Sequence, residues 1–573
     1  MEKVARFVSF KTPKNSAINQ NQKSIPDSIG DKNQKFFNRF ILLGILLLAA
    51  FLRLYRIEDY MTFLGDEGRD ALVVYGILHG EFTLLGPTAS VGGFFLGPVY
   101  YYFMTPFLWL FNYNPVGPAV MVALFGIATV FLVYRVGSEF FDKKVGLIAA
   151  FLYTMSPLVI AYSRSSWNPN LMPFFSLLTM CVLYKALKTN KIKLFVLCGF
   201  LFGILMQIHY LALFLGVVAF FYILLTRINK AIFASKDYFY ILIGFLVGWL
   251  PFLAFEIRHG FPNIQSIVSF VFNQDQGGPI VETDFLETIY NAFFRLFARL
   301  VVNFPPPEQV ALQVSANIAI WYWLTLLLGT ISVFLLLKRF LVGLNNKEEF
   351  RKMSLLILWL IVGIGLFGFY KKPIYDYYFG FMFPLPFMLV GLTISSLYTN
   401  AYELIRYKRI NAAGIRLTGK VLAVGIFVAL AWINLQGIPF RYPANRQLRQ
   451  VEEISRFVLD KSEGKPFNFA LITGGNSDHA YRYFLTLWEK PPIGIKTFLD
   501  DPNRETVTDQ LFVVCEGNPC HPLGDPAWEV AGFGRAEIEK EWDVSVVKVF
   551  KLRHYKPSTS DGGRLIRQLP EKP

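Results

Sequence analysis

Residues 37–70 read FNRFILLGILLLAAFLRLYRIEDYMTFLGDEGRD, an apolar run followed about ten residues later by the acidic tetrad GDEG (65–68). The run over 37–56 has the ~20 residues that a helix needs to cross ~30 Å of hydrocarbon. A polar tail, residues 1–36, precedes the run. The run therefore lacks the short basic start and cleavage site of a signal peptide and is expected to remain as an anchor. The stretch therefore predicts a membrane protein with two adjacent carboxylates just outside the bilayer, where they are candidates for chemistry.

The composition of the whole chain agrees with a membrane protein. Of 573 residues, 54% are hydrophobic and only 17% are charged, which is more apolar than a soluble core requires. The 58 Phe and 28 Tyr suit rings that face lipid and settle at the interfaces. The net charge of +15 falls in short loops between apolar runs, which favours positive-inside topology over nucleic-acid binding. We predict an α-helical polytopic membrane protein with no nucleic-acid partner.

The basic residues alternate between successive loops, and this sets the predicted orientation. Five loops together hold 20 basic residues against 6 acidic ones. Because Lys and Arg resist translocation, these loops are predicted to be cytoplasmic. Residues 57–115 carry one basic residue, Arg69, against six acids, and are predicted to face outward. The five basic loops are residues 135–144, 185–193, 227–237, 338–352 and 403–420.

This scheme predicts eleven spans in the plasma (inner) membrane, with a cytoplasmic N-terminus and an extracytoplasmic C-terminus. Residues 94–111 are apolar enough to span but are broken by Gly97, Pro98 and Pro106. We interpret them as an interfacial helix, because counting them as a span would put the basic loop 185–193 outside. The predicted spans are residues 37–56, 116–136, 145–163, 170–187, 194–208, 210–226, 238–256, 314–337, 353–370, 377–397 and 421–437.

From about Ile438 the composition changes to that of a small soluble domain, predicted to be an extracytoplasmic α/β or α+β module. Its Cys515 and Cys520 could pair in an oxidising exterior, which the sequence leaves open. Cys181 and Cys198 lie within predicted spans and are expected to be core thiols. The expected strands are residues 467–473, 510–514 and 545–552, and the expected helices are residues 445–460 and 478–488. The chain thus divides into a polar tail (1–36), a transmembrane domain (37–437) and the C-terminal domain (438–573).

Ionisable groups next to hydrocarbon are costly, so those that depart from the local pattern are functional candidates. Asp66 and Glu67 are the first such pair, and the glycines on either side would let the backbone turn and leave room for a ligand. The alternative is a solvated acidic loop that only avoids the penalty for positive charge outside. Arg69 and Asp70 are interpreted as structural partners of this loop, and Arg69 is also a candidate contact with a substrate.

Two more candidates lie in predicted outer turns. Arg164, in SRSSWNPN (163–170), either snorkels to the interface or neutralises a phosphate, and Asn168 in the same turn is a candidate substrate contact. His209, in QIHY (207–210), is a further candidate contact. A single His without companion ligands is more often a hydrogen-bonded core residue than a metal ligand.

The number of predicted spans before it places the motif KKPIYDYY (371–378) outside, although its two lysines oppose the scarcity of basic residues expected there. An anion would explain Lys371 and Lys372, and a lipid phosphate is the preferred partner. Ordinary head-group binding, or a topology wrong by one span, remains open. Tyr377 in the same motif is another candidate substrate contact.

The sequence contains no Walker A motif, no GxGxxG after a strand, no HExxH, no paired CxxC and no GxSxG in a strand-to-helix context, so nucleotide-driven chemistry is unsupported. Outward carboxylates and cations instead suit transfer of a group from a membrane-embedded phosphate ester to an acceptor outside. A carboxylate can act as base on an acceptor hydroxyl, and cations can stabilise the departing phosphate.

Over roughly residues 37–437 the chain resembles a GT-C polytopic glycosyltransferase, similar to the bacterial protein mannosyltransferase and aminoarabinose transferase families. The resemblance rests on the order and spacing of short motifs. They are GDE (65–67) after the first span, GPVYYY (97–102) at the start of the interfacial helix, FDKKVG (141–146) at a basic turn, SP to SR (156–164) before the second outer loop, and KKPIYDYY (371–378) followed by FPLP (383–386).

The resemblance implies a polyprenyl-phosphate-linked sugar donor, a membrane lipid environment, and a protein, lipid or glycan acceptor on the extracytoplasmic face. It implies that Asp66 is the base that deprotonates the acceptor and that Glu67 positions Asp66 or the sugar. Arg164, with Lys371 or Lys372, would hold the phosphate.

The chain departs from such relatives in the second outer loop, where Asn168 and Asn170 replace a frequent carboxylate. Amides are poor substitutes for a carboxylate bridge to a divalent cation, so a metal-independent enzyme without a cofactor is favoured, and a divalent metal stays open as the alternative. Two other functions stay open. A lipid-linked sugar flippase would place its charges at the midplane between repeated halves, and no internal repeat is visible. A non-catalytic envelope assembly protein would have no need of the acidic pair.

Overall fold

The computed structural model describes residues 28–89, 92–228, 231–273, 284–310, 316–400, 412–517 and 519–556. Residues 1–27 of the predicted N-terminal tail lie outside this set, as does the first half of the predicted basic loop 403–420. The chain divides into two compact units, residues 1–44 and 45–573, and every contact described below lies within the second unit.

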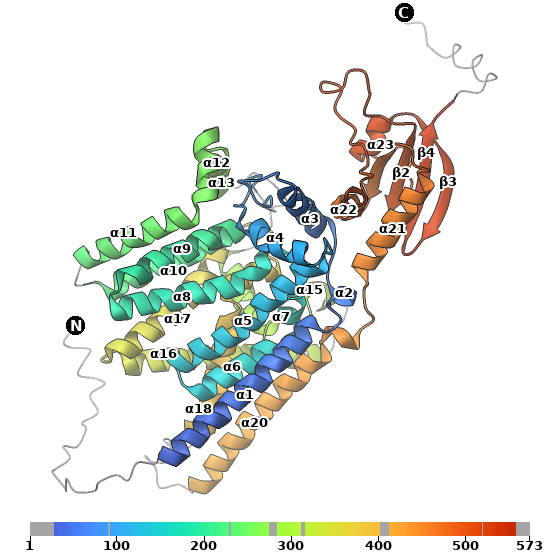
Figure 1. Ribbon diagram of the computed structural model, residues 1–573. Coiled ribbons are helices and arrows are strands. Elements are labelled where there is room, and N and C mark those ends of the chain that lie inside the picture. Colours follow the sequence, from blue (N-terminus) through green and yellow to red (C-terminus); the bar gives the residue numbers. More distant parts are fainter. Residues whose placement is uncertain are drawn as a thin grey trace, which may run out of the picture. The chain divides into compact units, whose positions relative to one another are not determined.

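Helices make up most of the described chain, and their order follows the apolar runs of the sequence (Figure 1). The α-helices are α1 (Ser28–Leu54), α2 (Ile57–Tyr60), α3 (Gly65–Leu78), α4 (Val99–Leu110), α5 (Val116–Phe140), α6 (Lys143–Met155), α7 (Pro157–Tyr162), α8 (Met172–Thr189), α9 (Ile192–Ile208), α10 (Leu213–Thr226), α11 (Ala231–Gly248), α12 (Leu250–His259), α13 (Pro262–Asn273), α14 (Phe285–Ala298), α15 (Pro307–Val310), α16 (Ala316–Gly343), α17 (Lys347–Gly365), α18 (Pro384–Asn400), α20 (Ala412–Gln436), α21 (Gln447–Lys461), α22 (His479–Leu487) and α23 (Trp528–Phe533). Short 3₁₀ segments are η1 (Asn168–Leu171), η2 (Tyr210–Ala212), η3 (Leu366–Phe369), η4 (Asp376–Met382) and η5 (Pro439–Arg441).

Six helical segments of the described chain are long and apolar enough to cross a membrane, or eight if each of two bent pairs is one span. The bent pairs are α11 with α12, at 76°, and η4 with α18, at 66°. Two shorter apolar segments, Ile192–Ile208 and Tyr210–Thr226, and helix α6 account for the other predicted spans. Each predicted span therefore overlaps helix within the described residues, while the number eleven stays a prediction. The six long segments are Phe36–Leu54, Val116–Phe140, Asn168–Thr189, Ala316–Gly343, Lys347–Phe369 and Leu417–Gln436.

Helix α4 occupies the stretch whose assignment the sequence makes difficult. It has only 12 residues and contains Pro106. At 1.5 Å per residue it is about 18 Å long, which is too short to cross ~30 Å of hydrocarbon. Its length agrees with the interpretation of residues 94–111 as an interfacial helix.

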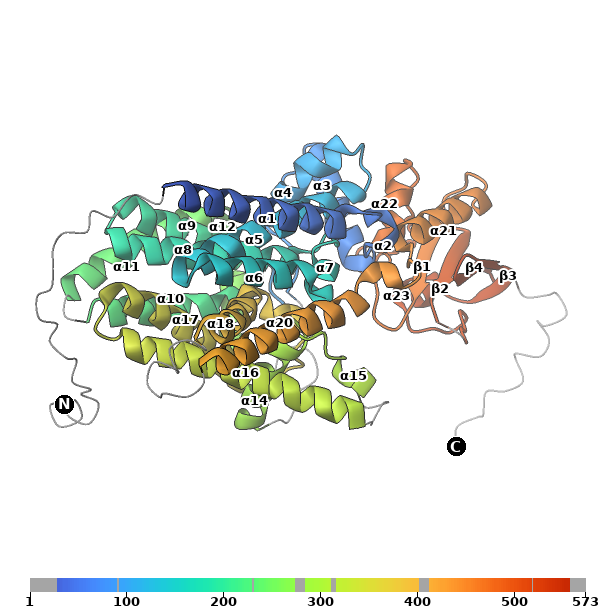
Figure 2. The same cartoon turned by 90° about the horizontal axis from the view of Figure 1, so that it is seen from below.

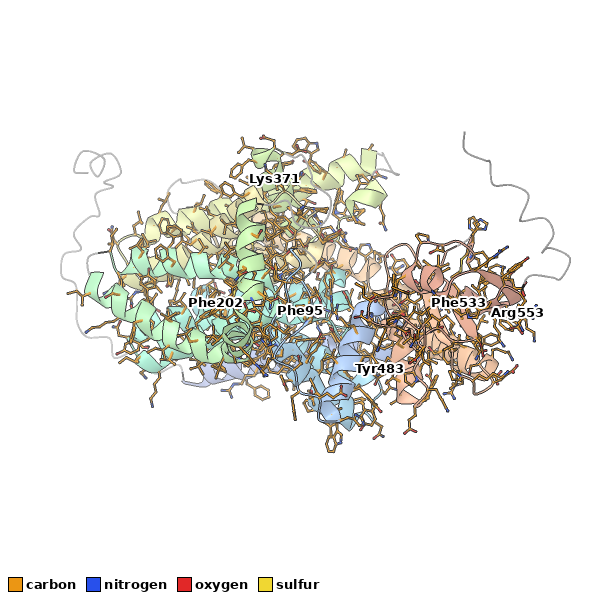
Figure 3. The ribbon with its side chains drawn as sticks, turned by 90° about the horizontal axis from the view of Figure 1, so that it is seen from above. Phe95, Phe202, Lys371, Tyr483, Phe533 and Arg553 are labelled. Atoms are coloured by element: carbon orange, nitrogen blue, oxygen red, sulfur yellow. A yellow bond between two sulfur atoms is a disulfide. The ribbon has the colours of Figure 1, made fainter. Side chains whose placement is uncertain are left out.

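The C-terminal module, defined here as residues 438–556, contains a four-stranded mixed sheet in the order β1-β2-β4-β3. Strand β1 (Asn468–Ile472) runs parallel to β2 (Gln510–Cys515), while β4 (Val547–His554) is antiparallel to both β2 and β3 (Ala536–Val544). Buried side chains of β2 and β4, such as Leu511 and Leu552, pack against Phe533 of α23, which Figure 3 labels. The small C-terminal sheet is as predicted, and the domain limits stay a prediction.

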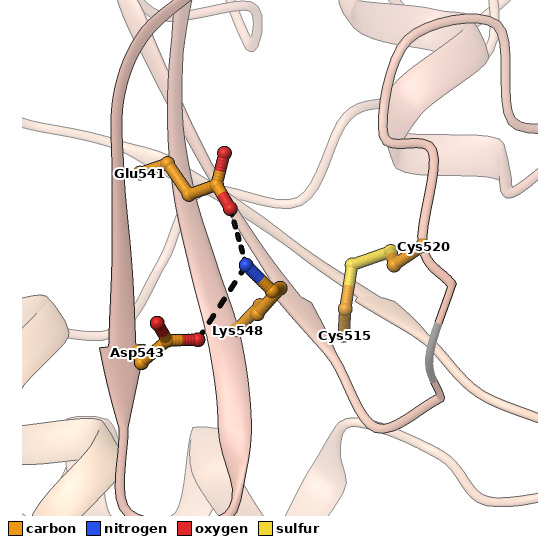
Figure 4. Close-up of a disulfide and its surroundings, with 5 residues drawn as sticks. All are labelled: Cys515, Cys520, Glu541, Asp543 and Lys548. Atoms are coloured by element: carbon orange, nitrogen blue, oxygen red, sulfur yellow. Dashed lines mark hydrogen bonds and ion pairs between the residues drawn. A yellow bond between two sulfur atoms is a disulfide. The ribbon is translucent and has the colours of Figure 1, made fainter.

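Strand β3, with the sequence AEIEKEWDV, is absent from the strands predicted above. It forms an edge of the sheet and is largely exposed, so its charged side chains carry no alternating apolar signal. Two of them, Glu541 and Asp543, pair with Lys548 of β4 (Figure 4). Charged edge strands of this kind resist pairing with other chains.

The four cysteines fall into two classes. Cys515 and Cys520 form a disulfide at the end of β2, which settles the pairing that the sequence leaves open (Figure 4). Cys181 and Cys198 are buried thiols within α8 and α9, as expected.

Helix α3, which begins with the acidic tetrad, packs against α22 of the C-terminal module (Figures 1 and 2). A Cβ on Gly65 would lie 2.0 Å from Ser477 Oγ, and one on Gly68 would lie 2.3 Å from the backbone nitrogen of Ala480. The two glycines therefore permit close approach of two backbones. This corrects the interpretation that they let the backbone turn and leave room for a ligand, because the tetrad is a regular first helical turn.

We expect Gly68→Ala to destabilise the protein, because the new methyl group would overlap backbone atoms of Ala480 that cannot rotate away. Overpacking of this kind costs about 1–3 kcal/mol. The measurement is the thermal unfolding midpoint of the purified protein. Gly425→Ala in α20 is the matched control, because nothing lies within 4 Å of its Cβ position, and it should leave the midpoint unchanged or raise it. A Gly68→Ala protein as stable as that control would contradict the close contact.

Candidate functional site

Asp66 lies in the first turn of α3 with its side chain 53% exposed. Its carboxylate pairs with Arg69 at 2.9 Å, and Arg69 also contacts Asp70 at 2.8 Å. Asp70 is fully buried and accepts a hydrogen bond from the Tyr101 hydroxyl at 3.2 Å. Burial raises the pKa of Asp70 to about 6, against the opposing effect of Arg69. These contacts agree with Arg69 and Asp70 as structural partners of the loop, and they leave Asp66 as the accessible carboxylate of the turn.

Glu67 is buried, unlike its neighbour. Its Oε2 accepts a hydrogen bond from the backbone N–H of Leu64 at 3.1 Å, so the side chain satisfies a donor at the start of α3. Burial raises the pKa of Glu67 to about 7, while hydrogen bonds from the backbone oppose the shift. No contact between Glu67 and the Asp66 carboxylate is found among the described residues. Glu67 therefore stabilises the helix that carries Asp66.

A cavity of about 470 Å³, called here the polar cavity, opens beside Asp66. It combines the rings of Trp167 and Tyr162 with amide and hydroxyl groups. Its walls come from residues 62–67, from the end of α7 and the segment after it, and from the C-terminal module. The lining residues are Thr62, Leu64, Gly65, Asp66, Glu67, Ala161, Tyr162, Ser165, Trp167, Asn170, Gly475, Asn476 and Ser477.

A smaller cavity of about 20 Å³, called here the connecting cavity, lies on another side of Asp66 and shares Asp66 and Trp167 with the polar cavity. It gathers five of the predicted site residues. They are Asp66, Arg69, Asn168, His209 and Tyr377.

The polar side chains around the connecting cavity are held by local hydrogen bonds. Asn168 Nδ2 donates to the carbonyl of Ile208 at 2.7 Å. His209 Nδ1 accepts from the N–H of Leu211 at 3.2 Å, so the proton of the neutral ring lies on Nε2. Burial lowers the pKa of His209 to about 3. The described residues contain no group of three or more His, Cys, Asp or Glu side chains able to hold a metal.

An apolar pocket of about 240 Å³ lies next to the connecting cavity, and Tyr210 lines both. Two cations, Lys371 and Lys372, line it together with aromatic and aliphatic side chains; Figure 3 labels Lys371. Lys371 is exposed, whereas Lys372 is buried. The other lining residues are Phe94, Met206, Leu211, Leu213, Phe214, Ile267, Phe270, Leu366, Phe369 and Tyr370.

The segment after the two lysines is held by an ion-pair cluster that the sequence analysis does not predict. Asp376 accepts from Arg295 at 2.6 Å and from Arg299 at 2.7 Å. The next residue, Tyr377, lies with its ring 4.5 Å from Trp167 in an edge-to-face contact. The signal in the sequence is the spacing of Arg295, on α14, and Arg299, directly after it, because residues four apart lie on one helical face. The cluster fixes Tyr377 at the connecting cavity.

Arg164 does not serve as the predicted phosphate ligand. Its side chain is buried, Nη1 donates to the carbonyl of Leu52 at 2.9 Å, and Nη2 donates to those of Tyr55 at 2.9 Å and Arg56 at 3.0 Å. Leu52 lies in the last turn of α1, where carbonyls lack helical partners, and Tyr55 and Arg56 directly follow the helix. A cation there also complements the helix dipole. Arg164 is thus a side-chain cap for α1.

Known proteins resemble this chain both in sequence and in fold. A model of the dolichyl-phosphate-mannose-protein mannosyltransferase family matches residues 96–255. YkcB and YycA of Bacillus subtilis (strain 168), each provisionally named a mannosyltransferase, are 26% identical over 192 and 204 residues, which is 34% and 35% of this chain. The matches cover 27% and 29% of those proteins, so the chain matches less than a third of the length of these relatives.

The crystal structure of ArnT from Cupriavidus metallidurans, bound to undecaprenyl phosphate, superposes with a TM-score of 0.55 at 12% identity. The superposition covers 91% of this chain and 98% of that one. The resemblance to GT-C glycosyltransferases is therefore confirmed at the level of the fold, over nearly the whole chain.

We expect the stability of Glu67→Gln relative to the unaltered protein to rise with pH. The pKa of Glu67 is about 7 in the folded protein against 4.5 ordinarily, so ionisation destabilises the unaltered protein as the pH rises from about 4.5 to about 7. The neutral amide can still accept from Leu64 and does not ionise. At ~1.4 kcal/mol per pKa unit, the relative gain is at most roughly 3.5 kcal/mol. Thermal unfolding of both proteins at pH 5 and pH 8 measures this gain. An equal stability difference between the two proteins at both pH values would contradict a raised pKa of the buried Glu67 carboxyl.

Proposed function

We propose that this protein is a membrane glycosyltransferase that moves a sugar from a polyprenyl-phosphate donor to an acceptor hydroxyl on the extracytoplasmic face. The observation that carries the proposal is a row of three neighbouring cavities, two of which are lined by Asp66. Tyr210 lines both the apolar pocket with its two lysines and the connecting cavity, and Asp66 lines both the connecting cavity and the polar cavity.

The apolar pocket is the donor side. Its aromatic and aliphatic walls suit the isoprenoid chain, whose transfer from water is favoured by about 25 cal/mol per Å² of buried apolar surface. Lys371 and Lys372 are placed to neutralise the phosphate that follows the chain. The ArnT structure, which was solved with undecaprenyl phosphate, supports this class of donor by its fold.

The reaction follows from charge and position. Asp66 takes the proton of the acceptor hydroxyl, and the oxygen forms a bond to the anomeric carbon of the sugar. The bond from that carbon to the phosphate oxygen breaks, and the polyprenyl phosphate departs with the electron pair. Lys371 and Lys372 stabilise its negative charge.

The polar cavity is the acceptor side. Trp167 and Tyr162 offer flat apolar faces, while Asn170 and Ser477 add polar side chains to the walls. This combination suits a hydroxylated acceptor. The reaction is proposed to need no divalent cation, since Asn168 and Asn170 stand where relatives often carry a carboxylate; loss of transfer in a chelator, restored by a divalent metal, would overturn this.

The acid pair and the C-terminal module are placed outside the cell in this proposal, on the strength of the alternating basic loops. Leu499, which is 90% exposed in the module, offers a site for Leu499→Cys. The native cysteines are buried or bridged, so the new thiol should react selectively with an impermeant maleimide in intact cells. Labelling only after lysis would overturn the orientation.

We expect Asp66→Asn to reduce transfer from a radiolabelled polyprenyl-phosphate sugar in reconstituted vesicles to below about a tenth of the unaltered rate. The amide keeps the shape of the side chain but cannot take the proton, and removal of a general base typically costs 10²–10⁴-fold. Glu58→Gln, an exposed acid of the same outer loop, is the control and should transfer normally. Transfer by Asp66→Asn above a tenth would remove Asp66 from the base role.

We expect Lys371→Gln to raise the donor KM or lower kcat, because the cation stabilises the phosphate both bound and departing. Lys371 is exposed, so its loss should change folding by no more than about 0.5 kcal/mol. The double variant Lys371→Gln/Lys372→Gln should show the same kinetic effect. Because Lys372 is buried, the unfolding midpoint of this double variant must also be measured. Lys347→Gln, at an exposed site at the start of α17, is the control. Unchanged kinetics in a folded double variant would place the phosphate contact elsewhere.

A further inference from the structure

The first backbone N–H of α3 is satisfied by a side chain from the far end of the chain. Gly65 N–H donates to Asn476 Oδ1 at 2.8 Å, across 411 positions of sequence. The first four N–H groups of a helix lack internal partners, and a neighbouring Asn, Asp, Ser or Thr usually caps them. The residue before Gly65 is Leu64, which has no polar side chain. Asn476 therefore caps α3 from the C-terminal module.

Asn476 is itself held in one orientation. Its Nδ2 donates to both carboxylate oxygens of Glu516, at 3.0 and 3.2 Å. Glu516 also accepts from the Thr473 hydroxyl at 2.8 Å and from the Tyr481 hydroxyl at 3.0 Å. With its amide nitrogen bound to a carboxylate, which only accepts, the Asn476 side chain must turn its oxygen toward Gly65.

Glu516, which holds Asn476, is itself anchored to the sheet of the C-terminal module. Glu516 directly follows Cys515, the last residue of β2 and one end of the disulfide. The Glu516 N–H donates to the carbonyl of Ile472, the last residue of the adjacent β1. The chain of contacts thus runs from two paired strands through Glu516 and Asn476 to the residue that precedes Asp66.

We propose that Asn476, oriented by Glu516, is a positioning residue for Asp66, so that the C-terminal module is part of the active site. The inference rests on the proposed function, in which Asp66 is the base. A base must lie within hydrogen-bond reach of the proton that it takes, and a misplacement of about 1 Å can cost about 10²-fold in rate. A shift of Gly65 moves Asp66 directly, because they are adjacent in one helical turn.

The test is a reciprocal exchange of the two partners in the full-length, reconstituted protein. Asn476→Asp places two carboxylates against each other, which is unfavourable unless they share a proton. Glu516→Gln alone keeps an oxygen that can accept from Asn476. Combining the two substitutions restores the bridge with donor and acceptor exchanged. Glu541→Gln on the exposed edge of the same sheet removes a carboxylate far from α3 in the sequence and serves as the matched control (Figure 4).

We expect Asn476→Asp to lower kcat about tenfold or more at pH 7.5 while leaving the donor KM unchanged, and to recover as the pH falls and the two carboxylates share a proton. Glu516→Gln should lie within about threefold of the unaltered protein, and so should the double variant. The Glu541→Gln control should be unchanged. The proposal predicts that the two substitutions are coupled. It would be overturned if kcat of the double variant were no higher than the combined effects of the two single substitutions give.

Hydrogen exchange of peptides covering residues 62–70 gives a readout that does not depend on activity. Asn476→Ala and Asn476→Asp should speed exchange at the start of α3 about tenfold, and the double variant should restore protection. Unchanged exchange in Asn476→Ala would overturn the bridge even if transfer falls. If the unaltered protein transfers no sugar, the proposed function fails, while the exchange experiment still decides whether Asn476 positions the first turn of α3.

Discussion

The close contact between the first turn of α3 and residues 476–480 is the constraint on which the rest of the site depends. Because Gly65 and Gly68 have no side chains, two backbones approach within van der Waals distance, and Asn476 can reach the first N–H of the helix. That approach closes one wall of the polar cavity and directs Asp66 toward the connecting cavity. A larger residue at either position would separate the transmembrane part from the module and open the cavity.

Charge pairing organises the loops around this contact. Asp376 holds two arginines and so fixes the segment that carries Tyr377, while Arg164 binds three carbonyls at the end of α1. Near hydrocarbon, an ionised group needs such partners, since water is scarce. The accessible charges at the cavities are those of Asp66 and Lys371. Exposure to the cavities, rather than the presence of charge alone, separates these candidates for chemistry from the structural residues, since Asp66 stays exposed although it pairs with Arg69.

The sequence predicts features that depend on local composition. The apolar runs, three of the four strands, the buried cysteines and the GT-C resemblance all follow from residue type and spacing, and the connecting cavity does gather Asp66, Arg69, Asn168, His209 and Tyr377. What it misses depends on contacts between distant segments. The sequence around Arg164 does not predict that the carbonyls at the end of α1 lie within reach. The sequence around Gly65 does not predict that Asn476 accepts from its N–H. Strand β3 is missed for a different reason, because an exposed, charged edge lacks the apolar alternation by which strands are recognised.

The short helices beside the apolar pocket bear on the surrounding lipid. The segments Ile192–Ile208 and Tyr210–Thr226 have 17 residues each, or about 25 Å at 1.5 Å per residue, against a hydrocarbon thickness of about 30 Å. A bilayer that meets such a pair thins locally to match it, at a modest cost per ångström. Several residues of the second segment, among them Tyr210 and Phe214, also line the apolar pocket. Local thinning of the bilayer would therefore occur next to the proposed donor site and would shorten the distance between a lipid headgroup and that site.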